Sequence, residues 1–489
     1  MKIMSERAGS RREKKKRNVF FIIACSIYLL ISVAFLGYVI SINMLPTSYI
    51  VAIIIADIIV TGLISLGILK RNKGYALNIV FTVLAVVIIG VYAFAYNYIN
   101  ATMNFIGTMA EEVEETEEYY VITLNNGKFS KIEEADGKNM HIFSADEDYS
   151  DIKADIATKA KVTYKNDESL VKLAEDILSS KSYFALVSAS QYSMIKDDNK
   201  DFESKTKIIY TINHKISKKE EKVIDENSDK TTTNGVFNVY ISGIDTSGNI
   251  GNVSRSDSNT LVTVNTNTHE VLLTSIPRDY YVTLHSKGAK DKLTHSGIYG
   301  ISETVSTIED LLDTEINYYV RVNFTTVIKL VDTLGGIDVK SDYTFTSSDG
   351  PSFVKGMNHM NGKQALAFSR ERHSFVTGDN QRIKNQQKVI EAIINKVLNS
   401  TTLMTKYTSI LSSLSGSFQT NISQDDISVL VKKQLQDMPS WKISMNSLSG
   451  SGASMATYSA GSQLLYVMVP NQASVTEAKD KINKVLGEN

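Results

Sequence analysis

Residues 236–276 read VFNVYISGIDTSGNIGNVSRSDSNTLVTVNTNTHEVLLTSI and contain three extended segments separated by turn-forming residues. The runs at 236–242, 260–266 and 270–276 are rich in apolar, β-branched and aromatic side chains, which is typical of strands. The short NTNTHE turn before the third run predicts antiparallel pairing, because parallel strands need a long crossover. If the three strands are consecutive neighbours, the end of the first, the start of the second and the end of the third lie at one edge.

Charged side chains occupy all three positions at this edge. They are Asp245 after the first strand, Arg255 and Asp257 before the second, and Arg278 after the third. Arg255 and Asp257 are two residues apart, so in an extended chain both side chains point to one face and Ser256 points to the other. The sequence therefore predicts that these four charged side chains converge on one rim.

Two later segments carry more side chains of the same kinds. In FSRERH, Arg370 and Arg372 share one face if the preceding helix has ended, which leaves Glu371 on the opposite face. In GDNQRIKNQQ, Asp379 resembles a helix N-cap. Two residues four positions apart share one face of the following helix, namely Arg382 and Gln386. We expect that face to point at the same rim.

This set of residues suits the binding of a pyrophosphate together with a metal ion. The planar guanidinium of arginine offers several N–H donors to phosphate oxygens. Two carboxylates that leave positions for water and phosphate oxygens suit Mg²⁺. Taken singly, each residue is more often part of a surface ion pair or a turn, and Asp379 reads equally well as a plain helix cap. The joint arrangement favours a bound anion, because clustered arginines without an anionic partner repel one another.

Strand and helix patterns alternate through the rest of the C-terminal half. Further strands are expected at 316–323 and 336–340, and helices at 302–313, 324–334, 361–369, 380–398, 423–436 and 476–486. A sheet covered by helices on both faces buries the apolar side of every element. We therefore expect an α/β fold at residues 226–489, a mixed, layered α-β-α domain with a partly antiparallel sheet.

Three apolar runs near the N-terminus are long enough to cross a bilayer as helices, which takes about 20 residues. Two further spans after the first exclude a cleaved signal peptide, and the runs cover residues 19–45, 48–69 and 76–99. Basic residues gather in the arm RREKKKR before the first run and in the KRNK loop at 70–73, whereas the loop at Pro46 is uncharged. The positive-inside rule then places the N-terminus in the cytoplasm and residues 111–489 outside.

Residues 111–225 are expected to form a small α+β domain. Strand composition occurs at 119–124, 182–189 and 206–216, and a helix pattern at 167–181. The acidic run EEVEETEEYY reads as a solvated face or a linker, and the polar stretch SKKEEKVIDENSDKTTTNG as a domain boundary. The predicted organisation is a basic arm with three transmembrane helices at 1–110, the accessory domain at 111–225 and the larger domain at 226–489.

The composition narrows the class of protein further. The single cysteine, Cys25, lies in the first apolar run, so no internal disulfide can form, which suits an exported bacterial surface protein. A net charge of −1 argues against a nucleic-acid binder. No GxSxG, HExxH or P-loop pattern is present, and His295 and His373 are not at metal-ligand spacing. Asp57, the charge inside a span, marks either a function or a helix pairing.

Six motifs behind membrane spans make the chain resemble the LytR-CpsA-Psr family of bacterial cell-wall enzymes. In order they are NVSRSDS, TSIPRD, DKLTHSGIYG, LVDTLGGIDV, MNGKQALAFSRERH and GDNQRIKNQQ. The resemblance is close over about residues 235–398 and looser beyond them. The three spans and the small domain look like the capsule-type CpsA branch of streptococci. Ser258 and Asn385 depart from the family pattern, in which Thr and Arg are frequent.

The resemblance implies a Mg²⁺-dependent phosphotransferase in the bacterial plasma membrane, with its catalytic domain at 226–489. Such an enzyme moves a glycopolymer, here capsular polysaccharide, from a polyprenyl-pyrophosphate carrier to a peptidoglycan sugar hydroxyl and releases polyprenyl phosphate. Carried over by motif, Asp245 and Asp257 would bind Mg²⁺. The pyrophosphate would be bound by Arg255, Arg278, Arg370, Arg372, Arg382 and Gln386. The expected catalytic residues are Asp257, Arg255, Arg278 and Asp379.

Several features of the reaction stay open in the sequence. Asp257 and Asp379 are both candidates for the general base, and the lipid tail is expected to thread between the sheet and the helices. Expected partners are the lipid-linked polymer, peptidoglycan and capsule-synthesis membrane proteins. One alternative is a Mg²⁺-dependent polyprenyl-pyrophosphate hydrolase, which needs the same residues. The other is a non-enzymatic, membrane-anchored regulator of capsule synthesis, although a cytoplasmic arm of about 18 residues is too short for a helix-turn-helix domain.

Overall fold

The structure is a computed structural model. It describes residues 2–70, 75–110, 116–143, 149–179, 183–199, 201–215, 235–244, 250–376, 378–399, 415–437 and 440–488. The chain divides into two units. The first comprises Met1–Gly107 with Ser423–Pro439, and the second comprises Thr108–Ile422 with Ser440–Asn489.

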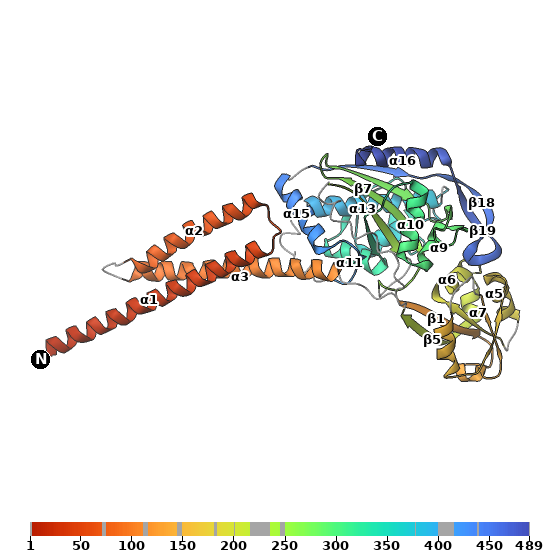
Figure 1. Cartoon of the computed structure of the whole chain (residues 1–489), viewed down its shortest axis with the longest axis horizontal. Coiled ribbons are helices and arrows are strands. Elements are labelled where there is room, and N and C mark those ends of the chain that lie inside the picture. Colours follow the sequence, from red (N-terminus) through yellow and green to blue (C-terminus); the bar gives the residue numbers. More distant parts are fainter. Residues whose placement is uncertain are drawn as a thin grey trace. The chain divides into compact units, whose positions relative to one another are not determined.

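The first unit is helical (Figure 1) and consists of α1 (Lys2–Ser41), α2 (Thr47–Leu69), α3 (Ala76–Ala110) and α15 (Gln424–Asp437). Stretches of 23, 23 and 33 residues in α1, α2 and α3 are long and apolar enough to cross a membrane, at Val19–Ser41, Thr47–Leu69 and Ala76–Thr108. The three long apolar helices expected from sequence are therefore confirmed as candidate spans, and the third helix is longer than expected because it continues past Ile99.

Asp57, which the sequence left open, takes part in contacts between the spans. The hydroxyl of Ser32 on α1 donates to Asp57 Oδ2 at 2.6 Å, and the hydroxyl of Tyr92 on α3 donates to Asp57 Oδ1. The hydroxyl of Thr61 lies 3.0 Å from that of Tyr28, which extends the polar contacts between α1 and α2. Hydrogen bonds between helices hold membrane bundles together where lipid offers no polar partner. The structure thus favours helix pairing as the role of Asp57.

Helix α15 belongs to this unit although it comes from the C-terminal part of the sequence. Lys432 Nζ donates to Asn43 Oδ1 in the α1–α2 connection at 2.7 Å, and Gln424 contacts Met103 near the end of α3. The connection after α1, the end of α3 and α15 therefore lie at the same end of the helical unit.

The second unit begins with an accessory subdomain, defined here as residues 116–215. Its mixed sheet has the order β3-β2-β4-β1-β5, formed by β1 (Thr116–Leu124), β2 (Asn139–Ile142), β3 (Thr163–Asn166), β4 (Phe184–Ser188) and β5 (Thr206–Lys215). Its helices are α4 (Ser150–Ala157), α5 (Leu170–Ser179), α6 (Ala189–Asp198) and α7 (Phe202–Lys205). The expected α+β character is confirmed, because apolar clusters pack on both faces of this sheet.

The acidic run was expected to be a solvated face or a linker. The linker alternative is wrong for its second half, because β1 begins at Thr116 and contains Glu117 and Glu118. Glu117 is buried, and its carboxylate accepts a hydrogen bond from the hydroxyl of Tyr119 at 2.7 Å. The strand continues into the run because antiparallel pairing with β5 extends to Thr116. Residues 111–115 lie outside the described residues.

The rest of the second unit, called the main subdomain here, is built on a six-stranded sheet of order β16-β11-β6-β7-β8-β17. The strands are β6 (Val236–Ile244), β7 (Ser256–Asn265), β8 (Glu270–Ile276), β11 (Tyr318–Val322), β16 (Gln419–Thr420) and β17 (Lys442–Ser447). β7 pairs antiparallel with both β6 and β8, as predicted, with Val262 opposite Val239 and Leu273. β11 and β17 join the sheet in parallel with β6 and β8.

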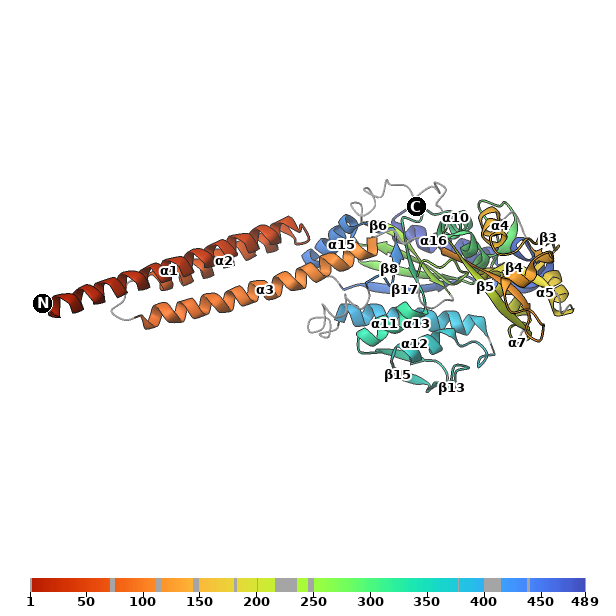
Figure 2. The same ribbon diagram turned by 90° about the horizontal axis from the view of Figure 1, so that it is seen from below.

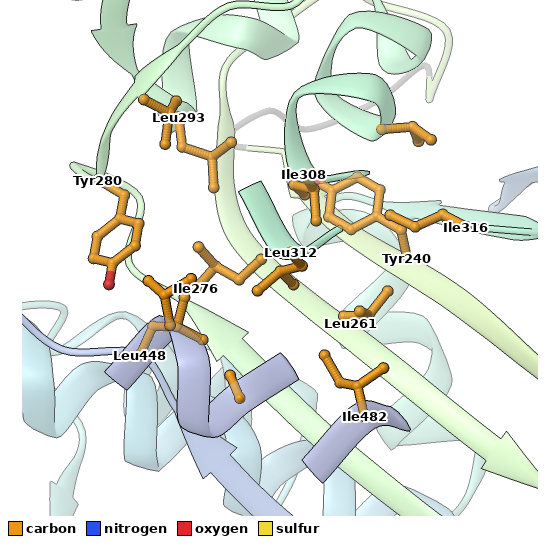
Figure 3. Close-up of a cluster of buried hydrophobic side chains, with 14 of the residues drawn as sticks. Tyr240, Leu261, Ile276, Tyr280, Leu293, Ile308, Leu312, Ile316, Leu448 and Ile482 are labelled. Atoms are coloured by element: carbon orange, nitrogen blue, oxygen red, sulfur yellow. The ribbon is translucent and has the colours of Figure 1, made fainter. Parts of the chain in front are cut away.

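Helices cover both faces of this sheet, which confirms the layered α-β-α architecture. One face packs on α10 (Ile301–Leu312) and α16 (Gln472–Leu486). Figure 3 shows Tyr240 and Leu261 of the sheet among Ile308 and Leu312 of α10 and Ile482 of α16. Beyond the other face lie α11 (Phe324–Thr333), α12 (Gly362–Arg370) and α13 (Asp379–Asn399), as Figure 2 shows.

Several smaller elements lie outside the central sheet. The strand expected at 336–340 forms, but β12 (Ile337–Ser341) pairs with β15 (Gly356–Met360) in a separate two-stranded sheet. The others are β13 (Phe345–Thr346), β14 (Ser352–Phe353), β9 (Tyr281–Thr283), β10 (Lys290–Lys292), the short helix α9 (Leu293–Ser296) and the 3₁₀ turns η1 (Ile132–Ala135), η3 (Gly297–Tyr299) and η4 (Tyr458–Ala460). The hairpin of β18 (Gly450–Thr457) and β19 (Gly461–Pro470) was not expected from sequence.

The accessory and main subdomains share a packed boundary. Thr116 N donates to Gly251 O at 3.0 Å, and Val253 N donates to Thr116 O at 2.9 Å. Ala460 and Leu465 of the β18–β19 hairpin are buried in the same apolar cluster as side chains of α5 and α6. The predicted linker is mostly outside the described residues, so the domain limits 1–110, 111–225 and 226–489 stay a prediction.

Candidate functional site

A cavity of about 520 Å³ lies between the central sheet and the helices α11, α12 and α13. Much of its wall is apolar and includes Ile241, Val320, Val322, Val327, Leu330 and Ile393. Ile241 and Val320 are directly opposite in the β6–β11 pair, so both point to the face that α10 and α16 do not cover. The rest of the wall carries guanidinium and carboxylate groups, so the cavity combines a charged part and an apolar part.

The structure brings most of the predicted site residues to this one cavity. Its wall contains Arg255, Asp257, Arg278, Arg370, Arg372, Arg382 and Gln386. Asp245 lies in the segment 245–249, outside the described residues. Asp379 is the first residue of α13, but its side chain is not among the described ones, so neither its role as a cap nor its role in the site is tested.

Strand alternation orients the residues at the start of β7. Arg255 and Asp257 line the cavity, whereas Ser256 Oγ lies 2.8 Å from both the Tyr240 hydroxyl and Ser242 Oγ. The face predicted for each of the three residues is therefore observed. Gly297 packs against this backbone so closely that a Cβ there would lie 2.7 Å from Ser254 O. A glycine at this position lets η3 support the strand without a gap.

Asp257 forms the charged centre of the cavity with Arg278. Arg278 Nη1 donates to Asp257 Oδ2 at 2.9 Å, and Thr294 Oγ1 donates to Asp257 Oδ1, also at 2.9 Å. Burial alone would raise the pKa of Asp257, but Arg278, Arg255 and Arg382 outweigh it and hold the pKa well below its ordinary value. Asp257 is therefore a carboxylate at neutral pH. Thr294 was missed by sequence reasoning, although it lies within the quoted motif DKLTHSGIYG.

Arg255 is buried and is paired with the accessory subdomain. Its Nη1 donates to Asp197 Oδ2 at 2.6 Å and its Nη2 donates to Ser193 Oγ at 3.0 Å. Burial would lower the pKa of Arg255, but the carboxylates of Asp257 and Asp197 outweigh it and raise the pKa. Nothing in the sequence near Asp197 indicated this contact, because the two residues are 58 positions apart.

Arg370 and Arg372 both line the cavity, although α12 continues one residue further than expected and ends at Arg370. Glu371 follows with an extended backbone, at φ −64° and ψ 128°. Arg370 Nη1 donates to Asp349 Oδ2 at 3.1 Å, and its guanidinium carbon lies 4.4 Å from the ring centroid of Phe324. Such a cation–π contact adds to the ion pair. Together they fix the guanidinium of Arg370 at the cavity wall.

Glu371 anchors this turn, a function that sequence reasoning missed. Its buried carboxylate accepts the backbone N–H groups of Ser348 and Ser374. Burial would raise the pKa of Glu371, but these hydrogen bonds outweigh it and lower the pKa. Glu371 therefore ties the β13–β14 connection to the segment that carries Arg370 and Arg372.

Two residues of α13 complete the charged part of the wall. Arg382 is buried, and Gln386 Oε1 accepts a hydrogen bond from Ser258 Oγ at 3.2 Å. This bond connects α13 with β7 across the cavity. Asn385, where the family often has Arg, is buried and donates to Phe368 O at 3.2 Å. It is therefore engaged in packing between α12 and α13.

The two histidines considered from sequence have other surroundings. His295 is buried, and its Nδ1 lies 2.6 Å from Asp291 Oδ1 and 2.7 Å from Ser459 Oγ. This group joins α9 to the β18–β19 hairpin and is closed to a substrate, so His295 is a structural hydrogen-bonding residue. His373 is exposed beside Arg372, with 3.4 Å between Arg372 Nε and His373 Nε2.

The donors in the cavity are compatible with Mg²⁺. Asp257 is an ionised oxygen ligand beside a space that a phosphate can enter, and Mg²⁺ is commonly held by one or two carboxylates plus substrate phosphates. A His and Asp group that could hold a metal also lies elsewhere, in the accessory subdomain. It consists of His141, Asp167 and Asp176, whose ligand atoms are within 4.8 Å of one another. Burial, aided by Asp176, raises the pKa of Asp167 to about 6.

Replacing Glu371 should loosen the turn that carries two of the arginines. In Glu371→Ala the Ser348 and Ser374 N–H groups lose their charged acceptor, which should cost about 1–3 kcal/mol in the free energy of unfolding. Because the pKa of Glu371 is lowered, its contribution is present above the ordinary value of about 4.3 and is lost as pH falls through the lowered pKa.

Urea unfolding followed by fluorescence of Trp441, the single tryptophan, measures this cost. The control is Glu477→Ala, which removes an exposed i,i+4 ion pair with Lys481 and should change stability by less than about 0.5 kcal/mol. Equal stabilities of the two variants at pH 7 would contradict the anchoring role of Glu371.

Comparisons with known proteins agree with the motifs. The chain is 38% identical over 213 residues to a protein of Bacillus licheniformis and 40% identical over 192 residues to one of Bacillus subtilis, both named polyisoprenyl-teichoic acid–peptidoglycan teichoic acid transferase TagU. These matches cover 43% and 39% of this chain and 66% and 61% of the relatives. The chain thus spans less than two thirds of the length of these relatives.

A crystal structure of B. subtilis TagU is similar with a TM-score of 0.41 and 31% identity, over 52% of this chain and 98% of that one. The relatives' names refer to teichoic acid, so they do not single out the capsule-type branch. The LytR_cpsA_psr family model matches residues 201–484, which is more than half of the chain. By this match the chain belongs to the LytR-CpsA-Psr family.

Proposed function

We propose that this chain is a phosphotransferase that moves a glycopolymer from a polyprenyl-pyrophosphate carrier to a hydroxyl of a peptidoglycan sugar. The observation that carries the proposal is the cavity itself, which joins an arginine-rich part to an apolar part. A polyprenyl pyrophosphate has the same two parts, a multiply charged head group and a hydrocarbon tail. The names of the TagU relatives, which refer to polyisoprenyl-linked polymer and peptidoglycan, support this reading.

The arginines are proposed to bind the pyrophosphate, with help from Gln386. Guanidinium groups bind phosphate oxygens through paired N–H donors, and the five in the cavity wall are Arg255, Arg278, Arg370, Arg372 and Arg382. In the reaction the acceptor hydroxyl attacks the phosphorus that carries the polymer, and the P–O bond to the second phosphate breaks. Polyprenyl phosphate leaves with the electron pair. Neutralising the charge of the transferred group supplies most of the rate.

Asp257 is proposed to bind Mg²⁺ together with Asp245, and Asp379 to serve as the general base or to support the arginines. Mg²⁺, when bound, would neutralise charge on the pyrophosphate. Asp257 keeps its negative charge through Arg278 and its other cationic neighbours, which makes it a weak proton acceptor. Metal binding therefore suits Asp257 better than the role of base, and Asp379 remains the candidate base.

The polymer is proposed to be capsular polysaccharide, with teichoic acid as the competing polymer named in the relatives. The three spans and the accessory subdomain support the capsule reading through the resemblance noted above. Capsule-synthesis membrane proteins are then the proposed neighbours. The basic N-terminal arm supports a cytoplasmic N-terminus, which leaves the end of α3 outside. The contact of α15 with the α1–α2 connection agrees with this topology, because an odd number of spans brings both to the outer side.

Arg278→Ala should abolish the transfer. It removes a donor to the head group and the main partner of Asp257, so we expect kcat to fall about 100-fold or more. In cells the readout is wall-bound against shed polymer, and in vitro it is transfer from a polyprenyl-pyrophosphate oligosaccharide to peptidoglycan. Lys355→Ala, an exposed residue outside the cavity wall, is the control.

Unchanged wall attachment in Arg278→Ala at normal protein level would refute the proposal. Release of polyprenyl phosphate by the wild type without polymer on peptidoglycan would identify the hydrolase instead. The regulator alternative gains support if removing the N-terminal basic arm abolishes capsule gene expression while attachment persists.

Transfer should require Mg²⁺. Chelation with EDTA should stop the reaction, added Mg²⁺ should restore it, and Asp257→Asn should raise the Mg²⁺ concentration for half-maximal rate about 10-fold. The rate as a function of free Mg²⁺ measures this. Asp167→Asn is the matched control, because it removes a carboxylate from the other candidate metal group. A full rate in EDTA would rule out the metal requirement.

The apolar part of the cavity should set the preference for long lipid chains. Val327→Trp on α11 places a large side chain in this part. We expect KM for a long-chain donor to rise about 10-fold and KM for a short-chain donor to change little, since a short tail needs less of the space. Val354→Trp, at an exposed position, is the control. Equal effects on both donors would show that the tail lies elsewhere.

A further inference from the structure

We propose that the accessory subdomain supplies part of the catalytic site, with Asp197 and Ser193 of α6 acting as positioning residues for Arg255. This inference rests on the proposed function, in which Arg255 binds the pyrophosphate head group of the substrate. None of the site residues predicted from sequence lies in residues 111–225. One residue of α6 nevertheless belongs to the cavity wall, because Asp197 lines the cavity beside Arg255.

The contact has the geometry of a specific guanidinium clamp. Asp197 Oδ2 accepts from Nη1 at 2.6 Å, and Ser193 Oγ accepts from Nη2 at 3.0 Å. Ser193 and Asp197 are four residues apart on one helix, so they present both acceptors on the same face. A guanidinium has five N–H donors, and these contacts engage two of them on its two terminal nitrogens. Two fixed points define the orientation of the planar group.

Helix α6 is itself firmly held. Its N-terminus carries a capping box, in which Ser188 Oγ accepts from Gln191 N and Gln191 Oε1 accepts from Ser188 N. Met194 and Ile195 are buried in the cluster that also contains Leu465 of the β18–β19 hairpin. The main subdomain therefore supports the helix that in turn orients Arg255.

The negative charge of Asp197 is important for the reaction because it balances the positive charge of the buried Arg255. The Arg255 side chain is 6% exposed, and a buried cation that loses its partner is costly. The other carboxylate that acts on Arg255 is Asp257, which is already paired with Arg278. Without Asp197, Arg255 would be drawn towards Asp257 and would compete with Arg278 for it. Asp197 thus holds Arg255 away from Arg278, and Asp257 keeps its hydrogen bonds with Arg278 and Thr294.

A double-mutant cycle tests this inference on the full chain in detergent. The variants are Asp197→Ala, Arg255→Ala and the double variant, and the control is Asp198→Ala, an exposed neighbour on α6 that bonds Gln463 and does not line the cavity. Two readouts are used: kcat and KM for the polyprenyl-pyrophosphate oligosaccharide, and binding of geranylgeranyl pyrophosphate. The binding readout does not require that the chain be a transferase.

We expect Asp197→Ala to lower kcat/KM about 10-fold and to weaken binding of the probe, as for loss of a charge-assisted hydrogen bond. In the Arg255→Ala background the same change should have less than about a twofold effect, since Asp197 acts through Arg255. Asp197→Asn keeps an oxygen acceptor and should recover part of the loss. Ser193→Ala should lower kcat/KM by a smaller factor.

Additive effects of Asp197→Ala and Arg255→Ala would overturn the inference, as would kinetics of Asp197→Ala equal to those of Asp198→Ala. If Asp197→Ala does not fold, as judged by Trp441 fluorescence, the Asn and Ser193→Ala variants carry the test. If the wild type binds the probe but transfers no polymer, the proposed function fails while the binding cycle still decides the role of Asp197.

Discussion

The site depends on the neutralisation of positive charge, because the guanidinium groups of several arginines lie in the wall of one cavity. Among the residues that the structure describes, three of them form ion pairs with carboxylates from different parts of the chain: Arg278 with Asp257, Arg255 with Asp197 and Arg370 with Asp349. The guanidinium groups of Arg255 and Arg278 are largely buried, so their positive charges repel one another with little screening by water, whereas Arg370 is 43% exposed. The carboxylates make the arrangement stable before any substrate arrives. They also fix where each arginine points, so a bound anion meets donors that are already oriented.

The backbone that delivers these groups is the three-stranded meander of β6, β7 and β8. Its register puts Ser258 opposite Gly243 and shifts between Gly243 and Ile244, at the cavity edge. Strand alternation then separates Arg255 and Asp257 from Ser256, which bonds to Tyr240 and Ser242 on the opposite face. The close approach of Gly297 supports the same residues from behind. A few backbone contacts thus set the directions of the charged side chains.

The two faces of the sheet have different packing. Residues such as Tyr240 and Leu261 fill the space under α10 and α16 (Figure 3). The opposite face, under α11 and α13, leaves a cavity whose wall has an aliphatic part beside the charged one. Apolar surface is costly to leave in water, so an apolar ligand that covers this part is favoured. The proposed lipid substrate therefore fits the side of the sheet where the protein's own side chains leave a cavity.

Much of the fold and part of the site follow from local sequence. The apolar runs determine the three spans, the short NTNTHE turn determines the antiparallel β7–β8 pair, and the spacing of Arg255 and Asp257 determines their shared face. These features depend only on local properties of the sequence, namely the length of an apolar run, the length of a turn and the alternation of side chains along a strand. Contacts between distant segments were decided only by tertiary packing. Examples are the pairing of β17 with β8, the hydrogen bond from Arg255 to Asp197, and the hydrogen bond from Ser348 N to the Glu371 carboxylate. Many segments have compatible patterns, and only the free energy of the packed whole selects which of them meet.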